Sequence, residues 1–92
     1  MEHVKSLKKP RPKPKPVRIS EWLGWAVYEL EKADVPMARL DAVVLMEDIS
    51  GQSRAWLFAH LETIFDPTLT LQYRHAVARR TKHEPLAYIR QK

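Results

Sequence analysis

The stretch PMARLDAVVLMEDISG, from Pro36 to Gly51, decides the expected fold. Pro36 suits the first turn of a helix, and Gly51 suits a left-handed C-cap. Between them, apolar residues recur at helical spacing and cover more than one stripe of the helix surface. Such a helix, expected over residues 37–50, is either central in a bundle or carries an adhesive patch. Its apolar residues are Ala38, Leu40, Ala42, Val43, Val44, Leu45, Met46 and Ile49.

A preceding helix is predicted over residues 20–33. Ser20 is a good N-cap, and Glu21 lies in the first turn, where the helix dipole favours a carboxylate. Trp25 and Tyr28 lie off the main apolar stripe, so they either cover a neighbouring helix or remain exposed to a partner. The stripe itself consists of Trp22, Leu23, Ala26, Val27, Leu30 and Ala33.

Three further helical segments are predicted towards the C-terminus. Ser53 caps a short helix over residues 54–61. A helix over residues 67–82 begins with an Asp-Pro pair, which is typical of an N-cap followed by the first helical position. A proline also begins the last helical turn, over residues 85–89. No run of residues alternates strictly between apolar and polar, so we expect an all-α fold, a small bundle of four helices plus a short C-terminal helical turn.

The N-terminal residues 1–18 differ in composition from the rest. They contain KKPRPKPKP and are expected to form a disordered Lys/Pro-rich arm, because proline removes a donor and restricts the residue before it. Seven Lys or Arg against one Glu give this arm a charge of +6, whereas the whole chain has +5. The remaining residues, 19–92, therefore carry a charge of −1, so the folded part is close to neutral. The arm is either a solubilising leader or an electrostatic arm for RNA, the ribosome or an acidic protein.

Composition also limits the possible classes of protein. The chain has no cysteine, so it has neither a disulfide framework nor a thiolate metal site. No apolar run approaches the roughly 20 residues that cross a bilayer, and no secretory signal is recognisable. We expect a cytoplasmic monomer without a membrane contact.

The motifs typical of catalytic, cofactor-binding and metal-binding sites do not occur in this sequence. The two glycines, Gly24 and Gly51, are far apart, so no phosphate-cradling loop exists. The histidines lack the spacing of a zinc site. We therefore assign no catalytic, cofactor-binding or metal-binding residue.

Two kinds of noncatalytic role can be assigned to individual residues. Asp41 lies beside the inward row of its helix, and we expect it to form a partly buried ion pair with Arg79 or Arg80. Aromatic and apolar groups left over from the core are candidates for partner binding. These candidates are Trp25, Tyr28, Val43, Met46 and His60, although His60 better suits a helix end where it bonds nearby carbonyls.

Several motifs in a fixed order resemble the N-terminal domain of the peptide chain release factor glutamine methyltransferases, the HemK/PrmC family. They cover residues 19–89, and the second and last are together fairly specific. In chain order they are ISEWL (19–23), ARLDA (38–42), RAWLFAH (54–60), DP (66–67), VARR (77–80) and EPLAYI (84–89).

The resemblance implies a substrate-recognition domain. In this family the whole enzyme transfers a methyl group from S-adenosylmethionine to the glutamine of the Gly-Gly-Gln motif in class 1 release factors. A second domain, joined by a linker, holds the cofactor and the catalytic residues. Residues 90–92 would begin that linker, so the 92 residues would be noncatalytic by themselves.

The sequence departs from the family pattern at three places. His83 replaces a glycine, Leu61 replaces a frequent proline so that the helix before it should run longer, and Arg90-Gln91 replaces a glycine. Histidine in a left-handed C-cap costs about 1 kcal/mol unless it finds another cap geometry. The alternative function is a stand-alone helical adaptor that binds RNA or the ribosome through its basic arm.

Overall fold

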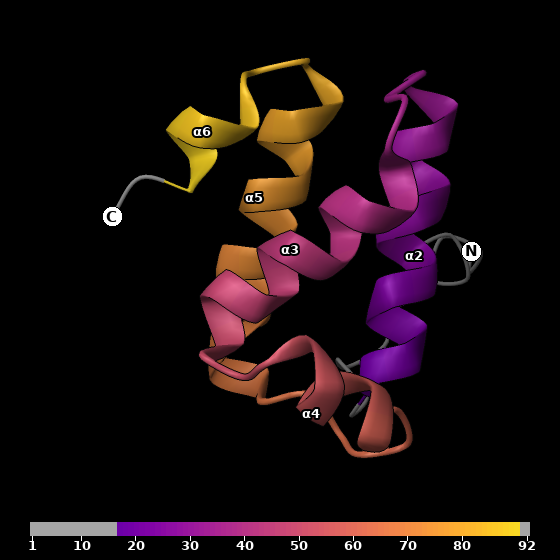
Figure 1. Cartoon of the computed structure of the whole chain (residues 1–92), viewed down its shortest axis with the longest axis vertical. Coiled ribbons are helices and arrows are strands. Elements are labelled where there is room, and N and C mark those ends of the chain that lie inside the picture. Colours follow the sequence, from indigo (N-terminus) through magenta and orange to yellow (C-terminus); the bar gives the residue numbers. More distant parts are fainter. Residues whose placement is uncertain (1–16, 91–92) are drawn as a thin grey trace, which may run out of the picture.

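Helix α3 (Ala38–Ser50) crosses between α2 (Ile19–Lys32) and α5 (Thr70–Thr81) in the computed structural model, which describes residues 17–90 (Figure 1). These three helices pack against one another in pairs and enclose the core. The smaller elements are α4 (Arg54–Ala59), the 3-10 turn η1 (Pro67–Leu69) and α6 (Leu86–Ile89).

The predicted all-α fold is confirmed for residues 17–90, which contain no strand beyond one isolated bridge between Arg18 and Ile64. The disordered arm was predicted over residues 1–18, of which residues 1–16 lie outside the described part. The prediction is wrong for Val17 and Arg18, because Val17 accepts a hydrogen bond from the backbone N–H of Phe65 and Arg18 donates one to Glu21. No helix in residues 17–90 is both long enough and apolar enough to cross a membrane.

The start of α2 corrects the predicted N-cap. The helix begins at Ile19, so Ser20 lies inside it and Arg18 precedes it. The backbone N–H groups of Ile19 and Ser20 donate to the carbonyls of Thr63 and Leu61, at 2.9 Å each. The loop after α4 therefore satisfies the first two backbone donors of the helix, which have no partner within it. Glu21 accepts a further hydrogen bond from the backbone of Arg18.

The predicted boundaries of α3 and the start of α4 are confirmed within a residue. Gly51 ends α3 with φ of 73°, and the Ser53 hydroxyl accepts a hydrogen bond from Trp56 N at 3.0 Å. Helix α4 is shorter than predicted, however, since it ends at Ala59. The ring of His60 donates from Nδ1 to the carbonyl of Trp56 at 2.7 Å, and this bond takes the place of the next helical turn.

The segment that leads into α5 is tighter than predicted. Asp66 caps it by accepting hydrogen bonds from the backbone and hydroxyl of Thr68, but the turn after it is a 3-10 helix. The α-helix begins only at Thr70. Helix α6 follows Pro85, as predicted.

Tyr73 on α5 is the largest fully buried side chain. Its ring lies against Trp22 and Phe65, and its hydroxyl donates to the carbonyl of Ala42 at 2.9 Å. Burial raises the pKa of this phenol well above its usual range. The residue thus joins α5 to α3 at the centre of the bundle.

Candidate docking groove

A groove of about 450 Å³ lies where α2, α3 and α4 meet. Most of its lining is aliphatic or aromatic, which suits an apolar side chain from another molecule. We call it the α2–α3–α4 groove. It is lined by Ser20, Leu23, Gly24, Val27, Arg39, Val43, Phe58 and Leu61.

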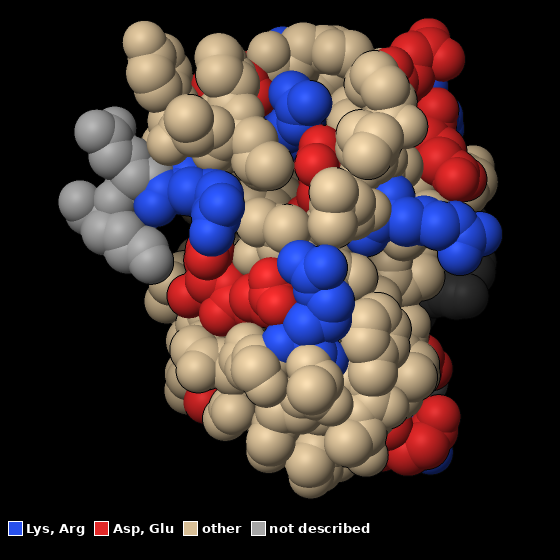
Figure 2. All heavy atoms as spheres, in the orientation of Figure 1, with Lys and Arg blue, Asp and Glu red and all other residues tan. Residues whose placement is uncertain are grey.

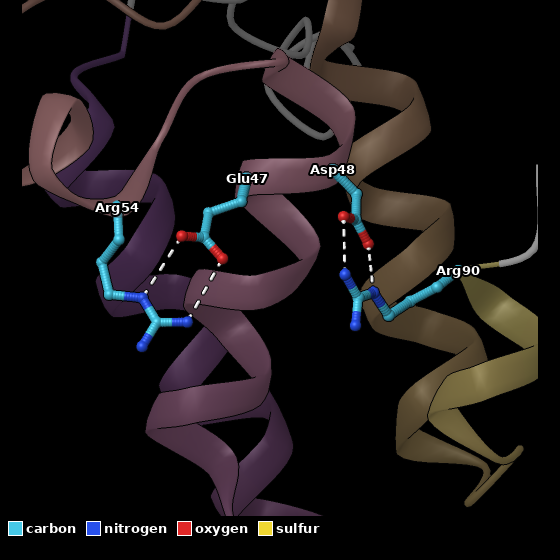
Figure 3. A network of polar contacts seen from close by, with 4 residues as sticks. All are labelled: Glu47, Asp48, Arg54 and Arg90. Carbon is cyan, nitrogen blue, oxygen red and sulfur yellow. Dashed lines mark hydrogen bonds and ion pairs between the residues drawn. The ribbon is translucent and has the colours of Figure 1, made fainter.

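An ion pair links the α4 wall of this groove to α3. Glu47 of α3 accepts two hydrogen bonds from the guanidinium of Arg54, at 3.2 and 3.3 Å (Figure 3). Arg54 is the first residue of α4, and Phe58 follows one turn later with 52% of its surface exposed. The pair therefore links α3 to α4 one turn before this exposed ring.

The floor of the groove includes the interior glycine of α2. A Cβ added to Gly24 would meet nothing within 4 Å, so the packing of the described residues does not require glycine at this position. Glycine inside a helix is less favourable than alanine by about 1 kcal/mol. Glycine at position 24 therefore leaves the backbone of α2 accessible to close approach by another molecule.

The structure brings only part of the predicted contact set to this groove. Val43 lines it. Tyr28 is 61% exposed but stands elsewhere on α2, with the Lys32 ammonium 5.0 Å from its ring centroid. Trp25 is partly buried and covers Tyr73 of α5, with ring centroids 6.4 Å apart.

The other two predicted contacts, Met46 and His60, also lie outside the lining of the groove. Met46 is wrong as a partner contact, because its side chain is fully buried in the core. It lies on the face of α3 that the neighbouring helices cover. His60 stacks on Trp56, with ring centroids 3.9 Å apart, and its Nδ1 ends α4.

Sequence reasoning missed most of the groove. Gly24, Arg39, Phe58 and Leu61 were not among the candidates. A glycine in the middle of an otherwise good helix was a usable signal, because it carries a cost that local structure does not explain. The other residues gave no signal, since their proximity depends on how the helices pack.

The predicted ion pair of α3 and α5 is formed by Arg80. Its Nε lies 2.9 Å from Asp41 Oδ2, with side-chain exposures of 18% and 6%. Arg80 also donates to the carbonyl of Glu84 at 3.0 Å. Arg79, the alternative partner, pairs instead with the Glu84 carboxylate, which lowers the pKa of that carboxyl.

The end of the described chain is held by further polar contacts. Arg90 donates to both carboxylate oxygens of Asp48 on α3, at 2.7 and 3.2 Å (Figure 3). His83 adopts the left-handed conformation expected of the family glycine, with φ of 63°. Its Nε2 donates to the carbonyl of Ala33 at 2.8 Å, so the side chain also ties this turn to the end of α2.

Charges of both signs are interspersed on the face drawn in Figure 2, without a large field of one sign. No cluster of potential metal ligands occurs among residues 17–90. The α2–α3–α4 groove has no carboxylate in its lining to take the hydroxyls of a ribose, so its residues do not fit S-adenosylmethionine.

The fold and the groove define a small all-α domain with a hollowed surface at a junction of helices. The family model described as the PrmC N-terminal domain matches residues 21–90, and the chain belongs to this family.

Curated relatives agree with this membership. The chain is 42% identical over 57 residues to a release factor glutamine methyltransferase of Bordetella pertussis, a match over 62% of this chain and 21% of that protein. Proteins of the same description are 37% identical over 60 residues in Leptospira interrogans and 36% over 74 residues in Haemophilus influenzae. These matches cover 65% and 79% of this chain, but 21% and 25% of the relatives. The chain thus spans about a fifth to a quarter of their length. No solved structure matches the chain.

Proposed function

We propose that residues 19–89 are the substrate-recognition domain of a release factor glutamine methyltransferase. The observation that carries this proposal is the match of residues 21–90 to the PrmC N-terminal domain, together with the relatives, which are release factor glutamine methyltransferases. The bound substrate would be a class 1 peptide chain release factor. Methyl transfer from S-adenosylmethionine to its Gly-Gly-Gln glutamine would belong to a catalytic domain connected through residues 90–92.

The α2–α3–α4 groove is the surface that best supports such a role. It combines an open apolar lining with a wall, α4, that an ion pair links to α3. Interface hot spots are enriched in aromatic groups that enter well-packed pockets, and Phe58 supplies an exposed aromatic edge. The domain would hold the release factor while another part of the enzyme carries out the reaction.

Binding of the 92-residue chain to a purified class 1 release factor tests the proposal. Isothermal titration calorimetry should detect saturable binding at about 0.15 M salt. Phe58→Ala should weaken it about tenfold, as expected of a hot-spot residue. Leu71→Ala is the matched control, because Leu71 is similarly exposed but lies on α5 outside the groove. Absence of binding would refute the recognition role.

The charge of +6 on residues 1–18 favours a second candidate, binding of RNA or the ribosome. Contacts to phosphates would make the affinity for RNA fall steeply between about 50 and 200 mM salt. Deletion of residues 1–16, which hold six of the arm's seven Lys or Arg and leave Arg18 at the start of α2, should abolish this binding and leave release-factor binding intact. RNA binding that survives the deletion would refute the arm as its source.

A further inference from the structure

We propose that the α2–α3–α4 groove takes an amphipathic helix of the protein partner, with a carboxylate beside its apolar face. The helix would cross α2 at Gly24, and its carboxylate would pair with Arg39. The inference rests on the proposed function, because the release factor is the protein expected to contribute this helix.

The apolar lining and the glycine favour close packing of a helix. Leu23, Val27 and Val43 form an aliphatic surface around Gly24. Helices pack with axes 8–10 Å apart, and the distance depends on the side chains at the point of contact. The open space at Gly24 would allow the shorter distances of that range. No described residue uses this space, so a helix from outside can occupy it.

The charge of the groove determines the chemistry of its occupant. Arg39 is the charged residue among the described groups that line it. No carboxylate of residues 17–90 lies within 4 Å of its guanidinium, which is also true of Arg74 on α5, whereas Arg54, Arg79, Arg80 and Arg90 all have acidic partners. An apolar occupant with a neighbouring Asp or Glu would supply the missing charge, and a basic one would be repelled.

The backbone of the groove favours a helix over an extended peptide. An extended partner gains affinity from main-chain hydrogen bonds to an exposed sheet edge. The principal walls are the helices α2, α3 and α4, whose interior backbone groups are bonded within each helix. A partner that enters the groove must therefore satisfy its own backbone groups, which a helix does.

Substitutions of increasing size at Gly24 distinguish an effect on partner binding from an effect on the stability of the domain. Gly24→Ala and Gly24→Leu should raise the melting temperature by about 4–8 °C, because both residues form helix better than glycine. Release-factor binding should nevertheless weaken, by more than tenfold for leucine. Arg39→Glu should weaken it about tenfold, while Arg74→Glu, a change of the same charge on α5 outside the groove, should not. Unchanged affinity in the Gly24 and Arg39 variants, with wild-type binding intact, would overturn the inference and leave the proposed function standing.

Defined peptides test the groove independently of the release factor. Two lactam-constrained helices would share a leucine stripe and differ in one flanking residue, Glu or Lys. In ¹⁵N NMR spectra of the 92-residue chain, the Glu peptide should shift the amides of Gly24, Val43 and Phe58 and bind about tenfold more tightly than the Lys peptide. Equal binding of both, or shifts away from the groove, would overturn the inference.

The same spectra distinguish two other occupants. Groove shifts on deletion of residues 1–16, which spares Val17 and Arg18 and their contacts at the start of α2, would indicate the chain's own arm. Groove shifts that grow with protein concentration would indicate a second copy of the chain. Either result would replace the proposed partner helix, whereas spectra unchanged in both experiments support it.

Discussion

The ion pair between Asp41 and Arg80 should be the most costly polar contact to break in this domain. Asp41→Asn keeps the size of the side chain but removes its charge. Arg80 would then remain only 18% exposed, without its carboxylate partner. Its remaining hydrogen bond, to the carbonyl of Glu84, does not neutralise the charge.

The burial of the two side chains sets the magnitude. Removal of one partner costs about 3–5 kcal/mol for a fully buried pair and about 0–1 kcal/mol for an exposed one. Asp41 is nearly fully buried and Arg80 is largely buried, so we expect a loss of about 3 kcal/mol. A domain of this size is stable by about 5 kcal/mol or less, so more than half of its stability would be lost. The melting temperature should fall by about 12–24 °C.

Urea denaturation followed by circular dichroism at 222 nm measures this change. Arg79→Ala is the matched control, because its pair with Glu84 is at the surface and should contribute little. A double-mutant cycle with Arg80→Met tests the coupling, which should be at least about 1 kcal/mol. A loss below about 1 kcal/mol in Asp41→Asn would refute the reasoning that burial makes this pair costly to break.

Three further measurements test other contacts. Tyr73→Phe leaves the Ala42 carbonyl without its buried phenol donor and should cost about 1 kcal/mol in urea denaturation; no change would contradict that role. His83→Ala keeps the left-handed conformation but loses the bond to Ala33, so it should be less stable than both wild type and His83→Gly; the opposite order would refute strain at this turn. Hydrogen bonds from Thr68 lower the pKa of Asp66. Because this pKa is lower when folded, the carboxylate stabilises the fold above about pH 4, and the gain is lost as pH falls through the folded pKa. The melting temperature should therefore fall in acid, and by less in Asp66→Ala; an equal fall in both would count against this cap.

The sequence predicted the helical elements well because their signals are local. Proline, glycine and serine restrict the backbone or cap a helix within a few residues, and Gly51, Ser53 and Pro85 mark boundaries where the structure has them. The wide apolar surface of α3 also indicated a central helix. Its central position confirms this half of the prediction.

The sequence by itself therefore determined that the chain is helical, where most of its helices begin and end, and which family its motifs resemble. Only the tertiary structure decided that α2 begins before Ser20 with its first donors bonded to a loop backbone, that Met46 is buried, and that Gly24 and Phe58 share one groove. The physical reason is the distance along the chain over which each kind of interaction acts. Propensity and capping act over a few neighbouring residues, whereas burial and grooves depend on contacts between segments far apart along the chain.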